Sequence, residues 1–237
     1  MTAATVLVTG GNRGIGLEFC RQYLADGWRV IATARNPSAA DELQALTGPG
    51  ELVIEALDVT DHKQIDALAA SYAGQPIDVL LNNAGIIGPI PIPAHIDRQH
   101  FGSMDYELWS HVLRTNTFAP LKLAEALVKN VAASQQKKIV ALSSTVGSLV
   151  ERDTPAFAYA TSKTALNKAM RLLSGVLHEQ GISVGIFCPG YVQTRMDFGT
   201  ADVKPVDSVT GLRGLIDSLN LETTGTYRRY NGETIAW

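Results

Sequence analysis

The 237-residue sequence has only two cysteines, Cys20 and Cys188, which lie far apart and form no Cys-x-x-Cys pair. This excludes a disulfide framework and favours a reducing compartment, so we expect a cytoplasmic protein. No apolar run reaches the length of about 18 residues that suggests a membrane span, and no leader pattern opens the sequence. The five histidines include no His-x-x-x-His pair, so the sequence offers no metal site.

An excess of one charge is also absent. The formal net charge is −3 and there is no basic stripe, which argues against nucleic acid as a main partner. Hydrophobic residues make up 46% of the chain and charged residues 18%, which is ordinary for a globular protein. A chain of this length buries about 70% of its unfolded surface, so it needs no disulfide to be stable.

Seven short apolar or β-branched runs alternate with amphipathic segments such as IGLEFCRQYLAD and HKQIDALAASYAG. The first six runs are nearly continuous in apolar residues, which predicts largely buried strands. The alternation predicts a single-domain Rossmann-type, doubly wound α/β fold, with a mostly parallel seven-stranded sheet and helices on both faces. The predicted strands are residues 5–9, 28–34, 52–56, 77–82, 138–144, 183–188 and 226–230.

No linker or internal repeat divides the chain, so we expect one domain over residues 1–237. The Pro-rich stretch GPIPIPAHI, residues 88–96, is predicted to be a loop. In an open parallel sheet, ligands bind outside the carboxyl ends of the strands. Candidate site residues are therefore expected directly after strands.

The glycine-rich turn GGNRGIG, residues 10–16, satisfies that condition, because it follows the first predicted strand and precedes a helix. Glycines allow a sharp turn and let backbone N–H groups approach a pyrophosphate. The spacing Gly-x-x-x-Gly-x-Gly differs from the usual dinucleotide fingerprint and from a Walker loop. A turn without a ligand is the plainer alternative, but the order of strand, turn and helix favours a dinucleotide site.

The second predicted strand ends in ATARN, where a site for NAD normally carries an acid that binds the ribose hydroxyls. Ala34 and Arg35 stand there instead. The planar guanidinium of Arg35 suits a 2′-phosphate, and Arg13 in the glycine turn adds a second positive charge. Both arginines could also be ordinary solvated charges. We favour NADPH over NADH.

Tyr159 and Lys163 in AYATSK lie four residues apart in a predicted helix, so both side chains share one face. Chance supplies this spacing in many chains, so the pair gains weight from its position after a strand that ends in two serines.

These motifs together resemble the short-chain dehydrogenase/reductase family along nearly the whole chain. TGGNRGIG resembles its cofactor turn, and LDVTD, NNAG, RTNTFAP, SSTVG, YATSK and PGYVQT follow in the family's order. The closing TYRRYNGETIAW resembles the C-factor-like carbonyl reductase branch. The resemblance implies hydride transfer between NADP(H) and the carbonyl or alcohol carbon of a small molecule.

The resemblance also implies a catalytic set of Asn116, Ser144, Tyr159 and Lys163. Tyr159 would be the general acid, and Lys163 would lower its pKa from about 10 and bind the nicotinamide ribose. Ser144 would donate a hydrogen bond to the substrate oxygen, and Asn116 would hold a water linked to Lys163. The implied cofactor-binding residues are Gly10, Asn12, Arg13, Gly14, Ile15, Gly16, Arg35, Asp58, Val59, Asn83, Ala84, Gly85, Tyr159, Lys163, Pro189, Gly190, Val192 and Thr194.

Two of these roles have alternatives. Asn116 could be a polar residue satisfied by the backbone where a helix breaks near Pro120. Ser143 competes with Ser144, which we prefer because it begins a Ser-x-x-Gly pattern ending at Gly147. Ser144 lies fifteen positions before Tyr159, a longer gap than is usual in the family.

Substrate loops are expected at residues 88–102, 149–157 and 196–206, and none identifies the substrate. The helices that carry Asn116 and Tyr159 are expected to support a homodimer or homotetramer. A redox-sensing or signalling protein that binds NADP(H) with little turnover is the main alternative. A sugar-nucleotide epimerase or dehydratase is disfavoured by the glycine spacing and by the lack of a long C-terminal substrate domain.

Overall fold

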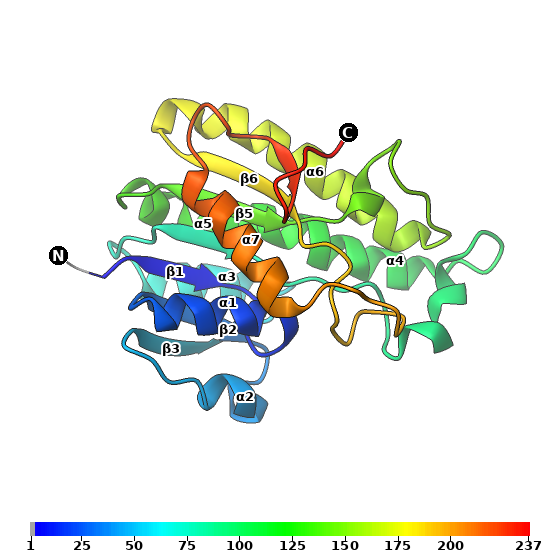
Figure 1. Ribbon diagram of the computed structural model, residues 1–237, viewed down its shortest axis with the longest axis horizontal. Coiled ribbons are helices and arrows are strands. Elements are labelled where there is room, and N and C mark those ends of the chain that lie inside the picture. The colour runs from blue at the N-terminus through cyan, green and yellow to red at the C-terminus, as the bar shows by residue number, and fades with distance from the viewer. Residues whose placement is uncertain (1–2) are drawn as a thin grey trace.

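The computed structural model describes residues 3–237 and contains a seven-stranded sheet in the order β3-β2-β1-β4-β5-β6-β7 (Figure 1). Every neighbouring pair of strands is parallel. The strands are β1 (Thr5–Val8), β2 (Arg29–Ala34), β3 (Glu51–Ala56), β4 (Val79–Asn82), β5 (Lys138–Leu142), β6 (Ser183–Cys188) and β7 (Tyr227–Arg229). The doubly wound fold predicted from the sequence is confirmed.

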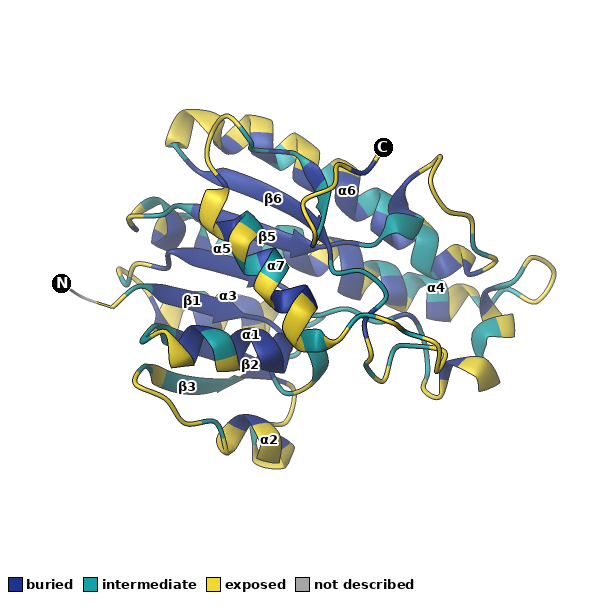
Figure 2. Ribbon diagram, viewed as in Figure 1, coloured by how far each residue is buried: buried dark blue, intermediate teal, exposed yellow. Residues whose placement is uncertain are grey.

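Helices cover both faces of this sheet, and each presents its apolar side to the strands (Figure 2). One face carries α1 (Gly14–Ala25), α2 (Asp41–Gln44) and α7 (Pro205–Ser218), and the other carries α3 (His62–Ser71), α5 (Ala119–Ala132) and α6 (Phe157–Leu177). Between residues 3 and 237, no helix has both the length and the apolar character needed to cross a membrane. Short 3-10 turns occur at Pro37–Ala39, Ile92–Ala94, Ile96–Gln99, Thr145–Gly147 and His178–Gln180.

The prediction of six buried strands is wrong for β3. All residues of β3 are exposed or half-buried, whereas β1, β4, β5 and β6 are buried throughout. The strand order explains the difference, because β3 lies at the edge of the sheet and pairs with β2 alone. Its apolar sequence did not reveal that position.

Helix α4 (Tyr106–Leu113) continues into α5 through a π turn, Arg114–Phe118, that contains Asn116. The N–H of Ala119 donates to the carbonyl of Arg114, five residues back, which defines the π turn. The expected helix break near Pro120 is therefore a π turn and not an interruption of the helix. Pro120 sits in the first turn of α5, where its missing N–H is tolerated, and the irregularity lies just before it.

The sequence motifs gather at one edge of the sheet, because the parallel strands all end there. Each strand from β1 to β6 is followed directly by one of them. The first predicted site residues after these strands are, in chain order, Gly10, Arg35, Asp58, Asn83, Ser144 and Pro189.

Candidate active site

The glycine turn after β1 has no room for side chains at its key positions. Gly10 and Gly14 have φ angles of +68° and +54°, in the left-handed region that favours glycine. A Cβ at Gly16 would lie 2.2 Å from the carbonyl oxygen of Gly10, so the start of α1 requires glycine. The turn leads directly into the N-terminus of α1, and a helix N-terminus is a favourable place for a pyrophosphate.

The NNAG segment after β4 holds this turn in place. Asn83 Nδ2 donates to the carbonyl oxygens of Thr9 at 2.7 Å and of Gly10 at 3.1 Å. The Thr9 hydroxyl accepts from the backbone N–H groups of Asn83 and Ala84 at 3.1 and 3.0 Å. The structure thus gives the Asn83 side chain a structural task, while contact with a cofactor stays a prediction.

Three arginines lie near one another beside the glycine turn. Burial, and next the charges of Arg195 and Arg35, lower the pKa of Arg13 below its ordinary value. Within the chain from residue 3 onward, none of the three forms an ion pair with an acidic side chain. Clustered cations beside a helix N-terminus suit a ligand that carries phosphate groups.

Arg195 was missed by the sequence reasoning. It follows Thr194, in the loop after β6, and that loop reaches the glycine turn through packing. The Thr194 Cγ2 atom lies 3.3 Å from where a Cβ at Gly14 would stand. No local pattern in the sequence signals this approach.

Asp58 lies two residues after the end of β3. Burial raises the pKa of this carboxyl. Hydrogen bonds from Thr60 and the charge of Arg35 together lower it by more, so the net pKa is below its ordinary value. Thr60 donates both its backbone N–H and its hydroxyl to Asp58 Oδ1, at 2.9 and 2.7 Å. No hydrogen-bond donor within residues 3–237 occupies Oδ2, which remains an acceptor beside the buried Val59.

Tyr159 and Lys163 lie together on α6, as the spacing predicted. The Lys163 ammonium is 5.7 Å from the centre of the Tyr159 ring and donates to the carbonyl oxygen of Leu142, at the end of β5, at 2.9 Å. Lys163 is only 6% exposed, and this burial lowers its pKa to about 8.

The expected lowering of the Tyr159 pKa by Lys163 is not observed. Burial raises the pKa of Tyr159 above its ordinary value, and the nearby Ser144 hydroxyl opposes that rise only in part. Lys163 directs its ammonium to the Leu142 carbonyl and lies beside the phenol ring. The phenol therefore stays protonated at neutral pH, which is the state that a general acid requires.

The two serines after β5 point to different partners. The Ser144 hydroxyl lies close enough to Tyr159 to lower the pKa of its phenol, whereas the buried Ser143 donates its hydroxyl to Asn167 Oδ1. The backbone at Ser144 is extended, with φ −157° and ψ 149°, and successive side chains of extended chain point to opposite sides. This geometry favours Ser144 over Ser143 as the serine that faces the site.

Asn116 is held by protein groups on all sides of its amide. Its Oδ1 accepts from the N–H of Ile86 at 2.9 Å, and its Nδ2 donates to the carbonyl of Ile86 at 2.8 Å and to the Ser162 hydroxyl at 3.0 Å. A Cβ at Gly85 would lie 3.3 Å from Asn116 Oδ1 and 3.6 Å from Lys163 Nζ, so both groups flank Gly85. A bound water at Asn116 stays a prediction.

The PGYVQT loop, residues 189–194, follows β6 at the carboxyl ends of the strands. Gly190 has a φ of +84°, and a Cβ there would lie 2.9 Å from the ring of Tyr230. Val192 is buried and pairs with Val203 in an isolated parallel bridge. These contacts hold the loop against Tyr230 and Val203.

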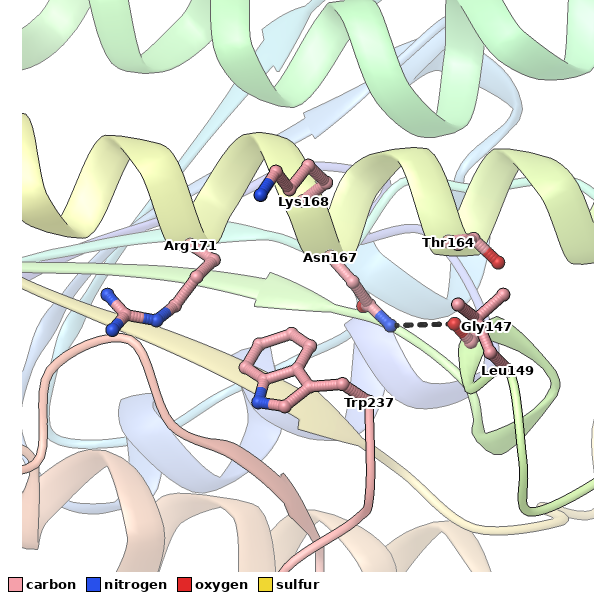
Figure 3. Close-up of a pocket in the computed structure, with 7 residues that line it drawn as sticks. All are labelled: Gly147, Leu149, Thr164, Asn167, Lys168, Arg171 and Trp237. Carbon is pink, nitrogen blue, oxygen red and sulfur yellow. Dashed lines mark hydrogen bonds between the residues drawn. The ribbon is translucent and has the colours of Figure 1, made fainter.

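A pocket of about 320 Å³ lies against a different face of α6 (Figure 3). Its walls include none of the predicted catalytic residues, although Leu149 belongs to the expected substrate loop 149–157. Four lining residues recur at the i, i+3, i+4 and i+7 positions that share one helix face. The lining residues are Gly147, Leu149, Thr164, Asn167, Lys168, Arg171 and Trp237.

Comparison with known proteins agrees with this geometry. The pattern of the short chain dehydrogenase family matches residues 4–202. C-signal of Myxococcus xanthus is 33% identical over 172 residues, which cover 72% of this chain and 99% of the relative.

Two solved structures share the whole fold. The NADPH-bound carbonyl reductase from chicken fatty liver aligns with a TM-score of 0.88 and 33% identity, covering 100% of both chains. A carbonyl reductase from Pseudomonas aeruginosa in complex with NADP aligns with a TM-score of 0.83 and 28% identity, again covering 100% of both chains. With its parallel sheet, its glycine turn and the match over residues 4–202, this chain belongs to the short-chain dehydrogenase/reductase family of oxidoreductases.

Proposed function

We propose that this protein is an NADPH-dependent carbonyl reductase that converts a ketone or aldehyde to an alcohol. The observation that supports it most directly is the proximity of Tyr159 to the buried Lys163, whose ammonium lies 5.7 Å from the centre of the phenol ring, with Ser144 close by at the end of β5. A proton donor, a second hydrogen-bond donor and a cation thus converge where a carbonyl oxygen would develop charge.

NADP(H) is the cofactor that suits the residues at the carboxyl ends of β1, β2 and β3. The glycine turn would bind its pyrophosphate, Arg13 and Arg35 its 2′-phosphate, and Asp58 its adenine amino group. The absence of side-chain space at Gly16 and the unpaired arginines both fit such a ligand. When bound, the nicotinamide of NADPH supplies the hydride that reduces the carbonyl carbon.

The residues of this chain handle the proton and the charge. As the carbonyl π bond breaks and its carbon gains a C–H bond, Tyr159 gives its phenolic proton to the oxygen. Ser144 donates a hydrogen bond to that oxygen, and Lys163 would bind the nicotinamide ribose hydroxyls. With a pKa of about 8, Lys163 keeps its charge at neutral pH. The NADP pool of cells is normally kept reduced, which favours this direction.

The test is NADPH consumption over a panel of ketones and aldehydes. We expect Tyr159→Phe to lower kcat by about 10³-fold, because it removes the proton donor, with the Kd for NADPH changed less than about twofold. Tyr72→Phe is the matched control, since its hydroxyl binds Glu55 at 2.7 Å away from the site, and it should leave kcat unchanged. Equal turnover of the wild type and Tyr159→Phe would refute the assigned role.

The similarity to C-signal of Myxococcus xanthus favours a second candidate, a signalling protein that binds NADP(H) with little turnover. The two candidates separate in one pair of measurements. Tight NADPH binding without consumption of any carbonyl would favour the signalling protein, whereas turnover above the Tyr159→Phe background favours the reductase.

The proposed enzyme is a single cytoplasmic domain whose substrate cleft is walled by residues 88–102, 149–157 and 196–206. We further propose a homodimer or homotetramer, because the outer face of α6 exposes Leu172 and Val176 by 59% and 68%. A monomeric mass by light scattering at micromolar concentration would contradict self-association.

A further inference from the structure

A buried group of hydrogen bonds lies beneath the turn that follows β5. Ser143 donates its hydroxyl to Asn167 Oδ1, and Asn167 Nδ2 donates to the carbonyl of Gly147 at 3.2 Å, the bond drawn in Figure 3. The Tyr227 hydroxyl donates to the carbonyl oxygen of Ser144. The partners come from the end of β5, from α6 and from β7, three elements that are distant in the sequence.

These groups are removed from water. Asn167 is 2% exposed and Tyr227 is 1% exposed. The turn also packs tightly, because a Cβ at Gly147 would lie 2.9 Å from the backbone carbon of Lys163 and 3.0 Å from Asn167 Nδ2. Buried hydrogen bonds are costly to leave unmade, so the turn has little freedom to shift.

We propose that Asn167 and Tyr227 are positioning residues that fix the 143–147 turn, and thereby hold the Ser144 hydroxyl at Tyr159. The inference rests on the proposed reductase function. The turn is held at the side chain of Ser143, at the main-chain carbonyl of Ser144 and at the carbonyl of Gly147. Three such points set both the place and the tilt of the backbone that carries Ser144.

The segment after β7 packs against Tyr227 and so fixes its position. The Trp237 ring packs against the Tyr227 ring with centroids 5.4 Å apart. Glu151, in the 149–157 loop, accepts from the N–H of Ala236 at 2.8 Å and from Arg229 Nη2 at 3.2 Å. The lengthened stretch between Ser144 and Tyr159 therefore supplies the residue that ties this segment to the site.

If Tyr227 had a purely structural role, replacing it would lower the stability of the protein without affecting Ser144 in particular. The two roles separate in Tyr227→Phe, which removes the hydroxyl and keeps the ring on Trp237. Tyr72→Phe is again the matched control, because it removes a tyrosine hydrogen bond from another buried ring, 4% exposed. Both variants should lower the melting temperature to a similar extent.

The readouts are kcat on the best carbonyl of the panel, KM for NADPH and the melting temperature. We expect Tyr227→Phe to lower kcat about tenfold with KM for NADPH changed less than about twofold, since small misplacements of a catalytic donor are costly. Tyr72→Phe should leave kcat within about twofold of the wild type. In a Ser144→Ala background, Tyr227→Phe should have no further effect on kcat, because the positioned hydroxyl is already gone.

Two results would overturn the inference. One is a kcat of Tyr227→Phe equal to the kcat of Tyr72→Phe. The other is a tenfold loss of kcat when Tyr227→Phe is added to Ser144→Ala. If Tyr227→Phe does not fold, Asn167→Leu is measured with the same readouts and the same expected loss. A wild-type protein without turnover would overturn the proposed function and this inference with it, whereas an active wild type with unaffected variants would overturn the inference alone.

Discussion

The two sides of the site are built by different physical means. At the ends of β1 to β3, the backbone makes the cofactor side: Gly16 has no space for a Cβ, and Arg13 and Arg35 lie exposed around it. At the ends of β5 and β6, buried polar side chains such as Lys163 and Asn167 make the catalytic side. The cofactor side should therefore be sensitive to added atoms and altered charge, and the catalytic side to lost hydrogen bonds and lost protons.

The largest change on the cofactor side is expected from Arg35→Asp. The new carboxylate would repel a 2′-phosphate and offer an acceptor to ribose hydroxyls. We expect the ratio of kcat/KM for NADPH to that for NADH to fall by about 10²-fold, or about 2.7 kcal/mol of discrimination. Lys129→Asp, an exposed charge reversal on α5, is the control and should leave the ratio unchanged. An unchanged ratio in Arg35→Asp would contradict the role given to Arg35.

Gly16→Ala tests the backbone of the same side and should have a smaller effect. Its Cβ would clash with the Gly10 carbonyl at 2.2 Å, so we expect a loss of about 2 kcal/mol in the free energy of unfolding and weaker NADPH binding. The measurements are urea unfolding and NADPH titration. Gly214→Ala in α7 is the control: nothing lies within 4 Å of the new Cβ, so it should stabilise the protein by about 0.5 kcal/mol. A Gly16→Ala protein as stable as Gly214→Ala would show that the turn can relax.

The smallest expected change is a pH dependence confined to the catalytic side. Because the pKa of Lys163 is about 8, its charge is lost as pH rises through that value, while Tyr159, with a raised pKa, stays protonated. We expect kcat/KM for carbonyl reduction to fall about tenfold from its plateau by pH 9. The arginines of the cofactor side keep their charge over this range.

Unfolding does not explain that loss. The folded pKa of Lys163 lies below its unfolded value of about 10.4, so the unfolded chain binds more protons between these values. The contribution of Lys163 to stability therefore rises with pH across this window. A melting temperature that does not fall while kcat/KM falls would support the assignment, and flat activity to pH 9.5 (about 1.5 units above the pKa) would contradict it.

Features carried by local pattern were predictable from the sequence. The apolar runs gave the strands in order, and the motif after each strand marked the sheet edge where the site forms. The exposure of β3 was not predictable, because it depends on which strand lies at the edge of the sheet.

The missed site residues depend on contacts between distant parts of the chain. Tyr227 reaches Ser144 across 83 positions, and Asn167 reaches Ser143 across 24. Arg195 approaches Arg13 only because one loop packs over another. The direction of the Tyr159 pKa was missed for a similar reason, because burial raises it and spacing does not reveal burial.

The π turn at Arg114–Phe118 joins α4 and α5 into one continuous helix whose two halves pack against different neighbours. Before it, Leu108 and Val112 pack with Ala158 of α6; after it, α5 packs against the sheet. Each residue adds about 100° of rotation, so removing one residue from this turn would swing everything beyond it by that angle. The turn thus sets the rotational phase between α4 and α5, and length changes there should be far less tolerated than substitutions.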